Sequence, residues 1–318
     1  MCIRDRIRTI HHLLNCSLNK SYLIIGCFCI TYFVWGATYL LSAFALDQIP
    51  AFALCGIRYL TAGGLSLLIS IFFFTPTRPT REEVQNAIIA GLLFMGLGAT
   101  GAIWALNYLD TGLTALIISG EPLVILLMLW LIDRTRPPSR AFLGVLLGII
   151  GMYLLVSQKD LVSEPEQWKG VIIILLSMLA WGYGSIFVSR SRLPKSQLLN
   201  SGIQMLVGGI FSWVVSLFVA EKLLSIGEYT YLTIGSVFFL IVFGSVIAFT
   251  AFNYLLKNVS TEKVVTNTYV NPIVAMFLGY YFRDELITNL SLVAALLMLT
   301  GVFFVNTSKA TKENPQQD

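Results

Sequence analysis

The chain has 318 residues, of which 56% are hydrophobic and 12% are charged, and its mean hydropathy is +0.78. Soluble domains are about a quarter charged, so this composition excludes an ordinary soluble protein and indicates a chain that is solvated by lipid. The net charge of +4 is small and gives no indication of nucleic-acid binding. The five cysteines and two histidines show no zinc-site spacing, and neither a metal nor another cofactor is expected.

Residues 1–20 are basic, and we expect them to form a cytoplasmic N-terminal arm. The first six residues resemble translated adapter sequence, so the native start is expected to lie further along the chain. Ten apolar runs follow, each near the roughly 20 residues that a helix needs to cross a bilayer. Because lipid cannot satisfy free backbone amides, each run is predicted to be a transmembrane helix. The predicted spans are 22–44, 50–74, 86–108, 112–132, 141–157, 170–189, 198–220, 231–255, 264–282 and 286–306.

One long stretch of the sequence occurs twice. Trp35, Gly56 and Gly63 recur 146 positions later as Trp181, Gly202 and Gly209, and from Pro122 onward the offset is 150. Each copy holds five predicted spans, and this odd number turns the second copy upside down in the membrane. The sequence therefore predicts an all-α membrane protein with ten transmembrane helices in two inverted five-helix repeats. Its predicted parts are the arm 1–20, a first repeat 21–157, an extracytoplasmic linker 158–169, a second repeat 170–307 and a cytoplasmic tail 308–318.

The distribution of Lys and Arg predicts the orientation. With the N-terminus placed inside, 16 of these 21 residues fall in inside segments and 4 in outside loops, while Arg58 lies within a span. Cytoplasmic loops are enriched in Lys and Arg. Both termini are therefore predicted to be cytoplasmic, in a multi-pass protein of the inner (cytoplasmic) membrane.

Two charged residues lie inside predicted spans, Arg58 in the second and Glu121 in the fourth. A charge at the bilayer centre costs on the order of 3 kcal/mol, so each should face protein or water. Glu121 is either a proton acceptor or cation site in a central cavity, or a structural tie to Arg58 or a neighbouring helix. Arg58 either attracts an anionic group of a substrate or reaches water near the outer end of its span. Its closeness to Pro50 favours the second interpretation of Arg58.

Two prolines occupy matched positions, Pro122 in the fourth span and Pro272 in the ninth. Proline frees the carbonyl four residues earlier and bends a helix, here near Ile118 and Thr268. Matched helix breaks in two halves indicate a transport site. A packing kink without a ligand is the alternative.

Polar and aromatic residues recur on one face of several spans, at helical spacing. They indicate either a hydrated substrate cavity or hydrogen bonds between helices, which contribute about 1 kcal/mol each. Glycines 144, 148 and 151 indicate close helix packing, and a homodimer face is left open. The candidate cavity residues are Trp35, Thr38, Trp104, Asn107, Trp181, Ser185, Asn253, Asn267, Tyr269 and Asn271.

No catalytic signature is present: the sequence lacks a nucleophile elbow, a Walker loop and a His-Glu-x-x-His motif, so no enzyme is expected. Several motifs instead carry a family resemblance: Trp35-Gly36-Ala37-Thr38-Tyr39, Arg58-Tyr59, Trp181-Gly182-Tyr183-Gly184-Ser185, Gly244-Ser245, and Tyr269-Val270-Asn271-Pro272-Ile273-Val274-Ala275. On these motifs the region from about 22 to 306 resembles the drug/metabolite transporter superfamily as two tandem EamA domains, in its YedA-type inner-membrane branch. The acidic position that follows the ninth span in this family matches Asp284-Glu285, whereas the first half departs from the pattern with Asp133-Arg134. Glu121 stands where this branch tends to have an uncharged residue.

The resemblance implies ten spans, two inverted halves and a central cavity, in a protein that moves metabolites or drugs. The expected function is secondary active transport, with export as the expected direction, of a small organic metabolite by alternating access. An amino acid or a drug-like compound is the expected type of substrate, and Glu121 is the candidate carrier of a coupling proton. The alternatives are an uncoupled facilitative exchanger and, from another class, a membrane enzyme or lipid-handling protein. The expected partners are the substrate and the lipid bilayer, without nucleic acid.

Overall fold

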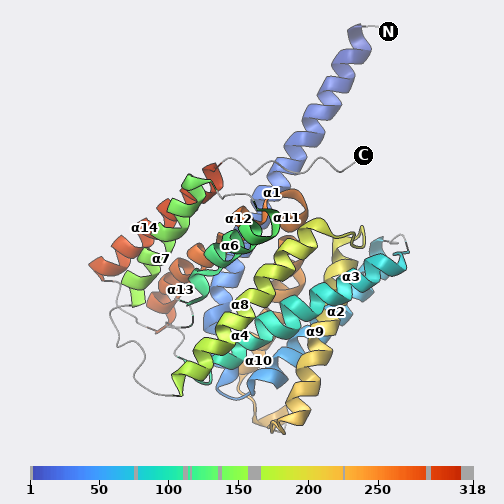
Figure 1. The fold of residues 1–318 in the computed structure, drawn as a ribbon. Helices are drawn as coiled ribbons and strands as arrows, with labels where there is room; N and C mark the ends of the chain where they lie inside the picture. The colour runs from blue at the N-terminus through green and yellow to red at the C-terminus, as the bar shows by residue number, and fades with distance from the viewer. Residues whose placement is uncertain are drawn as a thin grey trace.

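The computed structural model describes residues 3–74, 78–109, 114, 117–134, 138–156, 166–224, 226–283 and 288–308, and their regular structure is entirely helical (Figure 1). Six helical stretches in this part of the chain are long and apolar enough to cross a membrane. Large apolar side chains cover their outer faces; Phe72 is 74% exposed and Phe218 is 87% exposed. Such a surface is suited to lipid. The six stretches are Ser21–Leu46, Ala51–Phe73, Arg81–Ala105, Gln167–Arg190, Gln197–Phe218 and Tyr231–Asn258.

The remaining four predicted spans coincide with shorter helices. The helix α1 extends back to Ile3, through the predicted arm, and α8 begins at Gln167, inside the predicted linker. Residues 158–165 of that linker, Asp284-Glu285 and residues 309–318 of the tail lie outside the described part of the chain. The elements are α1 (Ile3–Leu46), α2 (Ala51–Phe74), α3 (Arg81–Gly91), η1 (Leu92–Ala99), α4 (Thr100–Ala105), α6 (Glu121–Asp133), α7 (Ser139–Val156), α8 (Gln167–Arg190), α9 (Gln197–Phe218), η2 (Ile226–Glu228), α10 (Tyr231–Phe239), η3 (Leu240–Ile247), α11 (Ala248–Asn258), α12 (Thr261–Val264), α13 (Asn267–Arg283) and α14 (Asn289–Thr307).

Hydroxyl side chains fix where several helices begin. Thr80 and Glu83 form a capping box at α3: Glu83 N donates to Thr80 Oγ1 at 3.2 Å, and Thr80 N donates to Glu83 Oε2 at 2.7 Å. The N-cap residues of α9, α10 and α14 are Ser196, Thr230 and Thr288. Their side chains accept hydrogen bonds from backbone amides of the first turn. These caps satisfy amides that have no partner inside the helix.

The helices α2 and α9, which the repeat relates to each other, pack together and run in opposite directions. A Cβ atom at Gly63 would lie 2.8 Å from Leu206 N, and one at Gly209 would lie 2.6 Å from Leu60 N. Leu60 is the repeat counterpart of Leu206, so the two contacts are related by the internal duplication. Along this pair, later residues of α2 meet earlier residues of α9, as expected for antiparallel helices.

This packing predicts opposite outcomes for two adjacent glycines of α2. We expect Gly63→Ala to destabilise the protein by about 1–3 kcal/mol, because the added carbon would press on the backbone of α9. A Cβ at Gly64 meets nothing within 4 Å, so Gly64→Ala should be neutral or stabilising by up to about 1 kcal/mol through helix propensity. Thermal unfolding in detergent measures both effects. Equal stability of the two variants would contradict the assigned contact.

The helices α7 and α14 form a second antiparallel pair, which lies side by side at one flank of the bundle (Figure 1). A Cβ at Gly144 would lie 2.6 Å from Gly301 O, and one at Gly151 would lie 2.7 Å from Ala294 O. Gly148 lies against the ring of Tyr269. The prediction that Gly144 to Gly151 could form a homodimer face is therefore wrong, because α14 and α13 of the same chain already cover these glycines.

Both third helices contain an eight-residue π-helical segment, η1 in the first half and η3 in the second. The sequence predicts continuous spans at 86–108 and 231–255, and the π segments lie inside both. A π turn widens a helix locally and is frequent at functional sites.

The fourth predicted span, 112–132, is not one helix. Residues 117–119 are helical, Gly120 forms a turn, and α6 begins at Glu121. Pro122 therefore lies in the first turn of α6, where its missing N–H removes no helical bond. The ninth predicted span, 264–282, is a single helix, α13, which begins at Asn267 after a turn that follows α12, and it contains Pro272.

Candidate substrate cavity

A partly open cavity of about 190 Å³ lies between the two halves. It is bounded by α1, α2, η1, α4, α6, α8, η3, α11 and α13, and Thr114 and Ile118 also contribute. Of the residues predicted from the sequence, seven line it. They are Trp35, Thr38, Arg58, Glu121, Trp181, Asn267 and Asn271.

Trp35 and Trp181 form one wall of the cavity. Their rings contact edge to face with centroids 5.9 Å apart, and Trp35 Nε1 donates to Gly244 O at 3.0 Å. Phe252 contacts both tryptophans, at 5.0 Å and 5.5 Å, and Phe94 contacts Trp181 at 4.9 Å. The two tryptophans thus form an aromatic layer together with Phe94 and Phe252, and the cavity lies on one side of this layer. Such a wall suits a flat apolar group of a ligand.

Arg58 reaches across from α2 to η3. Its Nε donates to Ser245 Oγ at 2.7 Å. A Cβ at Gly244 would lie 3.1 Å from Arg58 Nη2 and 3.0 Å from Thr38 Cγ2, so the guanidinium passes close beside this glycine. The interpretation that Arg58 only extends to water at the end of its span does not fit this contact. Arg58 is instead one of the residues that line the cavity.

Glu121 is 5% exposed and lies at the start of α6. Within the described part of the chain its Oε1 finds no hydrogen-bond partner, and no ion pair joins it to Arg58. An ionised carboxyl without a countercharge is expensive at low dielectric, so this position favours binding a proton or a cation.

Thr268, whose carbonyl precedes Pro272 by four residues, lines the cavity, and Pro272 cannot donate an N–H to it. Ile118 also lines the cavity, but the prediction that Pro122 frees its carbonyl is wrong, because Pro122 lies in the first turn of α6 and interrupts no helix. Asn271 is 3% exposed, and its Oδ1 also finds no partner among the described residues. Buried polar atoms without partners are rare in folded proteins and indicate a site for a ligand, a water molecule or an ion.

Five predicted residues lie away from the cavity. Trp104 packs on Phe52 and Tyr108, with centroids 5.3 Å and 6.2 Å away, and Asn107 is exposed in the turn after α4. Ser185 donates to Trp181 O at 2.9 Å. The other two are buried: Asn253 donates to Ser201, Gln204 and Phe249 O, and Tyr269 packs in a small cluster with Ile273, Met298 and Val302.

Tyr39, Tyr59 and Thr114 also line the cavity but were not among the predicted cavity residues. Tyr39 follows Thr38 on α1 and Tyr59 follows Arg58 on α2, so adjacency to predicted residues was the available signal. Thr114 lies in the predicted span 112–132, but no motif or polar stripe marked it.

Comparison with known proteins gives two matches to the EamA-like transporter family model, at residues 22–157 and 168–307. The chain is 29% identical over 290 residues to the uncharacterized inner membrane transporter YedA of Escherichia coli K12, covering 90% of this chain and 91% of the relative. It is 26% identical over 283 residues to the uncharacterized transporter YvbV of Bacillus subtilis, covering 88% and 90%.

A solved crystal structure aligns with a TM-score of 0.73 and 17% identity, over 89% of this chain and 96% of that one, and shows a shared fold. The family and the names of the relatives indicate a transporter and not an enzyme. Together with the apolar helices, the two family matches show that this chain is a multi-pass membrane protein and a member of the EamA-like transporter family.

Proposed function

We propose that the chain is a secondary active transporter that moves a small organic solute through the cavity by alternating access. Ten spans in two inverted repeats, at 21–157 and 170–307, are the architecture behind this proposal. The antiparallel packing of α2 on α9 and of α7 on α14 supports an inverted relation between the repeats. The matched π segments η1 and η3 support it as well.

One observation carries the proposal most strongly: the cavity between the halves is lined by three buried polar atoms that have no hydrogen-bond partner within the described residues. They are Thr114 Oγ1, Glu121 Oε1 and Asn271 Oδ1, three of the ten such side-chain atoms in that part of the chain. Arg58 adds a positive charge, and Trp35 and Trp181 add an aromatic wall. A solute with an anionic group for Arg58, hydrogen-bonding groups for Asn271 and an apolar body for the tryptophans fits this combination, as amino acids and drug-like acids do.

Proton coupling through Glu121 and outward transport across the inner membrane complete the proposal. The relative named an inner membrane transporter supports the location, and the Lys and Arg distribution supports cytoplasmic termini. Glu121 can take up a proton when the cavity is exposed to one side and release it on the other.

The proposal is tested by comparing metabolite profiles of cells with and without the protein, followed by reconstitution. A solute depleted inside the expressing cells is then measured in proteoliposomes with and without a pH gradient. Accumulation driven by the gradient supports coupled transport, whereas counterflow that is independent of any gradient indicates an uncoupled exchanger. No protein-dependent movement of any solute would contradict the transport function.

A further inference from the structure

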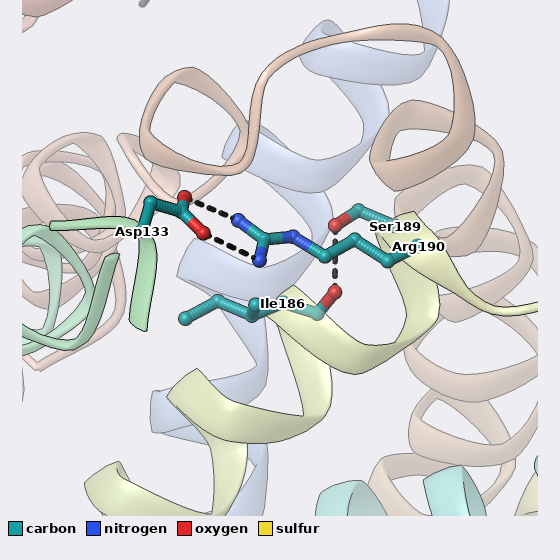
Figure 2. Close-up of polar contacts among 4 residues, drawn as sticks. All are labelled: Asp133, Ile186, Ser189 and Arg190. Atoms are coloured by element: carbon teal, nitrogen blue, oxygen red, sulfur yellow. Dashed lines mark hydrogen bonds and ion pairs between the residues drawn. The ribbon is translucent and has the colours of Figure 1, made fainter. Parts of the chain in front are cut away.

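One ion pair joins the far ends of two helices that border the cavity. Arg190 Nη1 and Nη2 donate to Asp133 Oδ1 and Oδ2 at 2.8 Å and 2.6 Å, in the bidentate arrangement of Figure 2. Asp133 is the last residue of α6, and Arg190 is the last residue of α8. We propose that this pair is a latch, which holds the α6–α8 end of the transporter closed and breaks when that end opens. The inference rests on the proposed function.

The latch lies at the end that the cavity does not reach. On α6 only Glu121 lines the cavity, and Asp133 is twelve residues further, about 18 Å along a helix. On α8 the last lining residue is Trp181, nine residues before Arg190. In the opposite direction the lining continues to Leu106, in the turn after α4. The structure is therefore closed at the α6–α8 end.

Two further layers close the same end. The aromatic layer lies between the cavity and the latch, because Phe94 and Phe252 lie on the parts of their helices that run toward this end. Beyond it, Lys257 Nζ donates to Ser191 O, and Asn86 Nδ2 donates to Arg192 O at 2.9 Å. Both contacts join other helices to the loop after α8. The Asp133–Arg190 contact differs from these two. It is an ion pair, and both of its residues lie on helices that line the cavity and end here.

The test uses two cysteine reporters in the full chain in lipid nanodiscs, with a water-soluble maleimide as the probe. Ser185→Cys reports opening of the α6–α8 end, because Ser185 is fully buried between Trp181 and the latch. Leu106→Cys reports access from the cavity side. We expect Asp133→Asn and Arg190→Gln to raise labelling of the first reporter by about two- to fivefold and to lower labelling of the second. Protein with only the native cysteines gives the background.

Two controls separate the latch from a local structural role. Glu82→Gln breaks the exposed Glu82–Arg192 contact (3.8 Å) at the same end and should change neither reporter. The exchange Asp133→Arg with Arg190→Asp should restore the original labelling, which a misfolded variant would not do.

Unchanged Ser185→Cys labelling in Asp133→Asn, failure of the charge exchange, or labelling of both reporters in the same direction would overturn the latch. Failure of the proposed function itself would give a different result. The Leu106→Cys reporter would then stay unreactive in the otherwise unaltered chain, because the cavity would not be reached from solution.

Discussion

Glu121→Gln should reduce solute accumulation driven by a pH gradient at least about tenfold, while downhill exchange of the same solute persists. Glutamine keeps the size of the side chain and its hydrogen-bonding capacity but cannot carry a proton. Glu121 is buried at the cavity, and no described residue pairs with its Oε1, so the carboxyl is free to exchange a proton with the cavity. Reconstituted vesicles with an imposed pH gradient give the measurement.

Glu262→Gln is the matched control. Glu262 is also buried, at 8% exposure, but lies in α12 and outside the cavity. We expect gradient-driven transport by this variant to remain within about twofold of the original when equal amounts of folded protein are compared. Full accumulation by Glu121→Gln would show that the coupling proton is carried elsewhere.

Trp35→Ala should reduce transport at least about tenfold and also lower stability by about 3–5 kcal/mol. The change removes the hydrogen bond from Nε1 to Gly244 O and the ring contacts to Trp181 and Phe252. The cavity then loses part of its wall, and the aromatic layer loses a member. Transport per folded molecule in proteoliposomes, together with thermal unfolding, separates the functional loss from the structural loss.

Trp104→Ala provides the comparison, because the sequence predicts both tryptophans as cavity residues and the structure places only Trp35 there. Trp104 packs on Phe52 and Tyr108 instead. This variant should lose stability but keep its transport per folded molecule within about twofold. An equal loss of transport in both variants would place the solute path nearer to Trp104 than the structure indicates.

Several features of the cavity were predictable because the duplication and the helical periodicity relate residues that lie far apart in the sequence. Repeat counterparts such as Trp35 and Trp181 meet at the interface of the halves, and the two asparagines of α13 lie one turn apart and face the cavity. The third span was misjudged at its end, because α4 stops at Ala105 and Asn107 is therefore no longer on a helical face.

The division of the fourth span was missed because the run 112–132 is apolar enough on average to predict one helix, and hydropathy does not report backbone breaks. Gly120-Glu121-Pro122 is itself a helix-start signal, with a turn residue, an acidic residue and a proline in succession. That signal was available in the sequence, whereas the widening of η1 and η3 was not, because no residue type specifies a π turn.

The glycine contacts between α2 and α9 restrict how this protein can rearrange. The backbones approach closely at Gly63 and Gly209, where Leu206 and Leu60 fill the space that the missing side chains leave, so sliding one helix along the other would drive these leucines onto neighbouring residues that carry side chains. Rotation about the crossing point avoids that collision. We therefore expect α2 and α9 to serve as a fixed pivot, with the helices that carry Trp35 and Trp181 swinging about it.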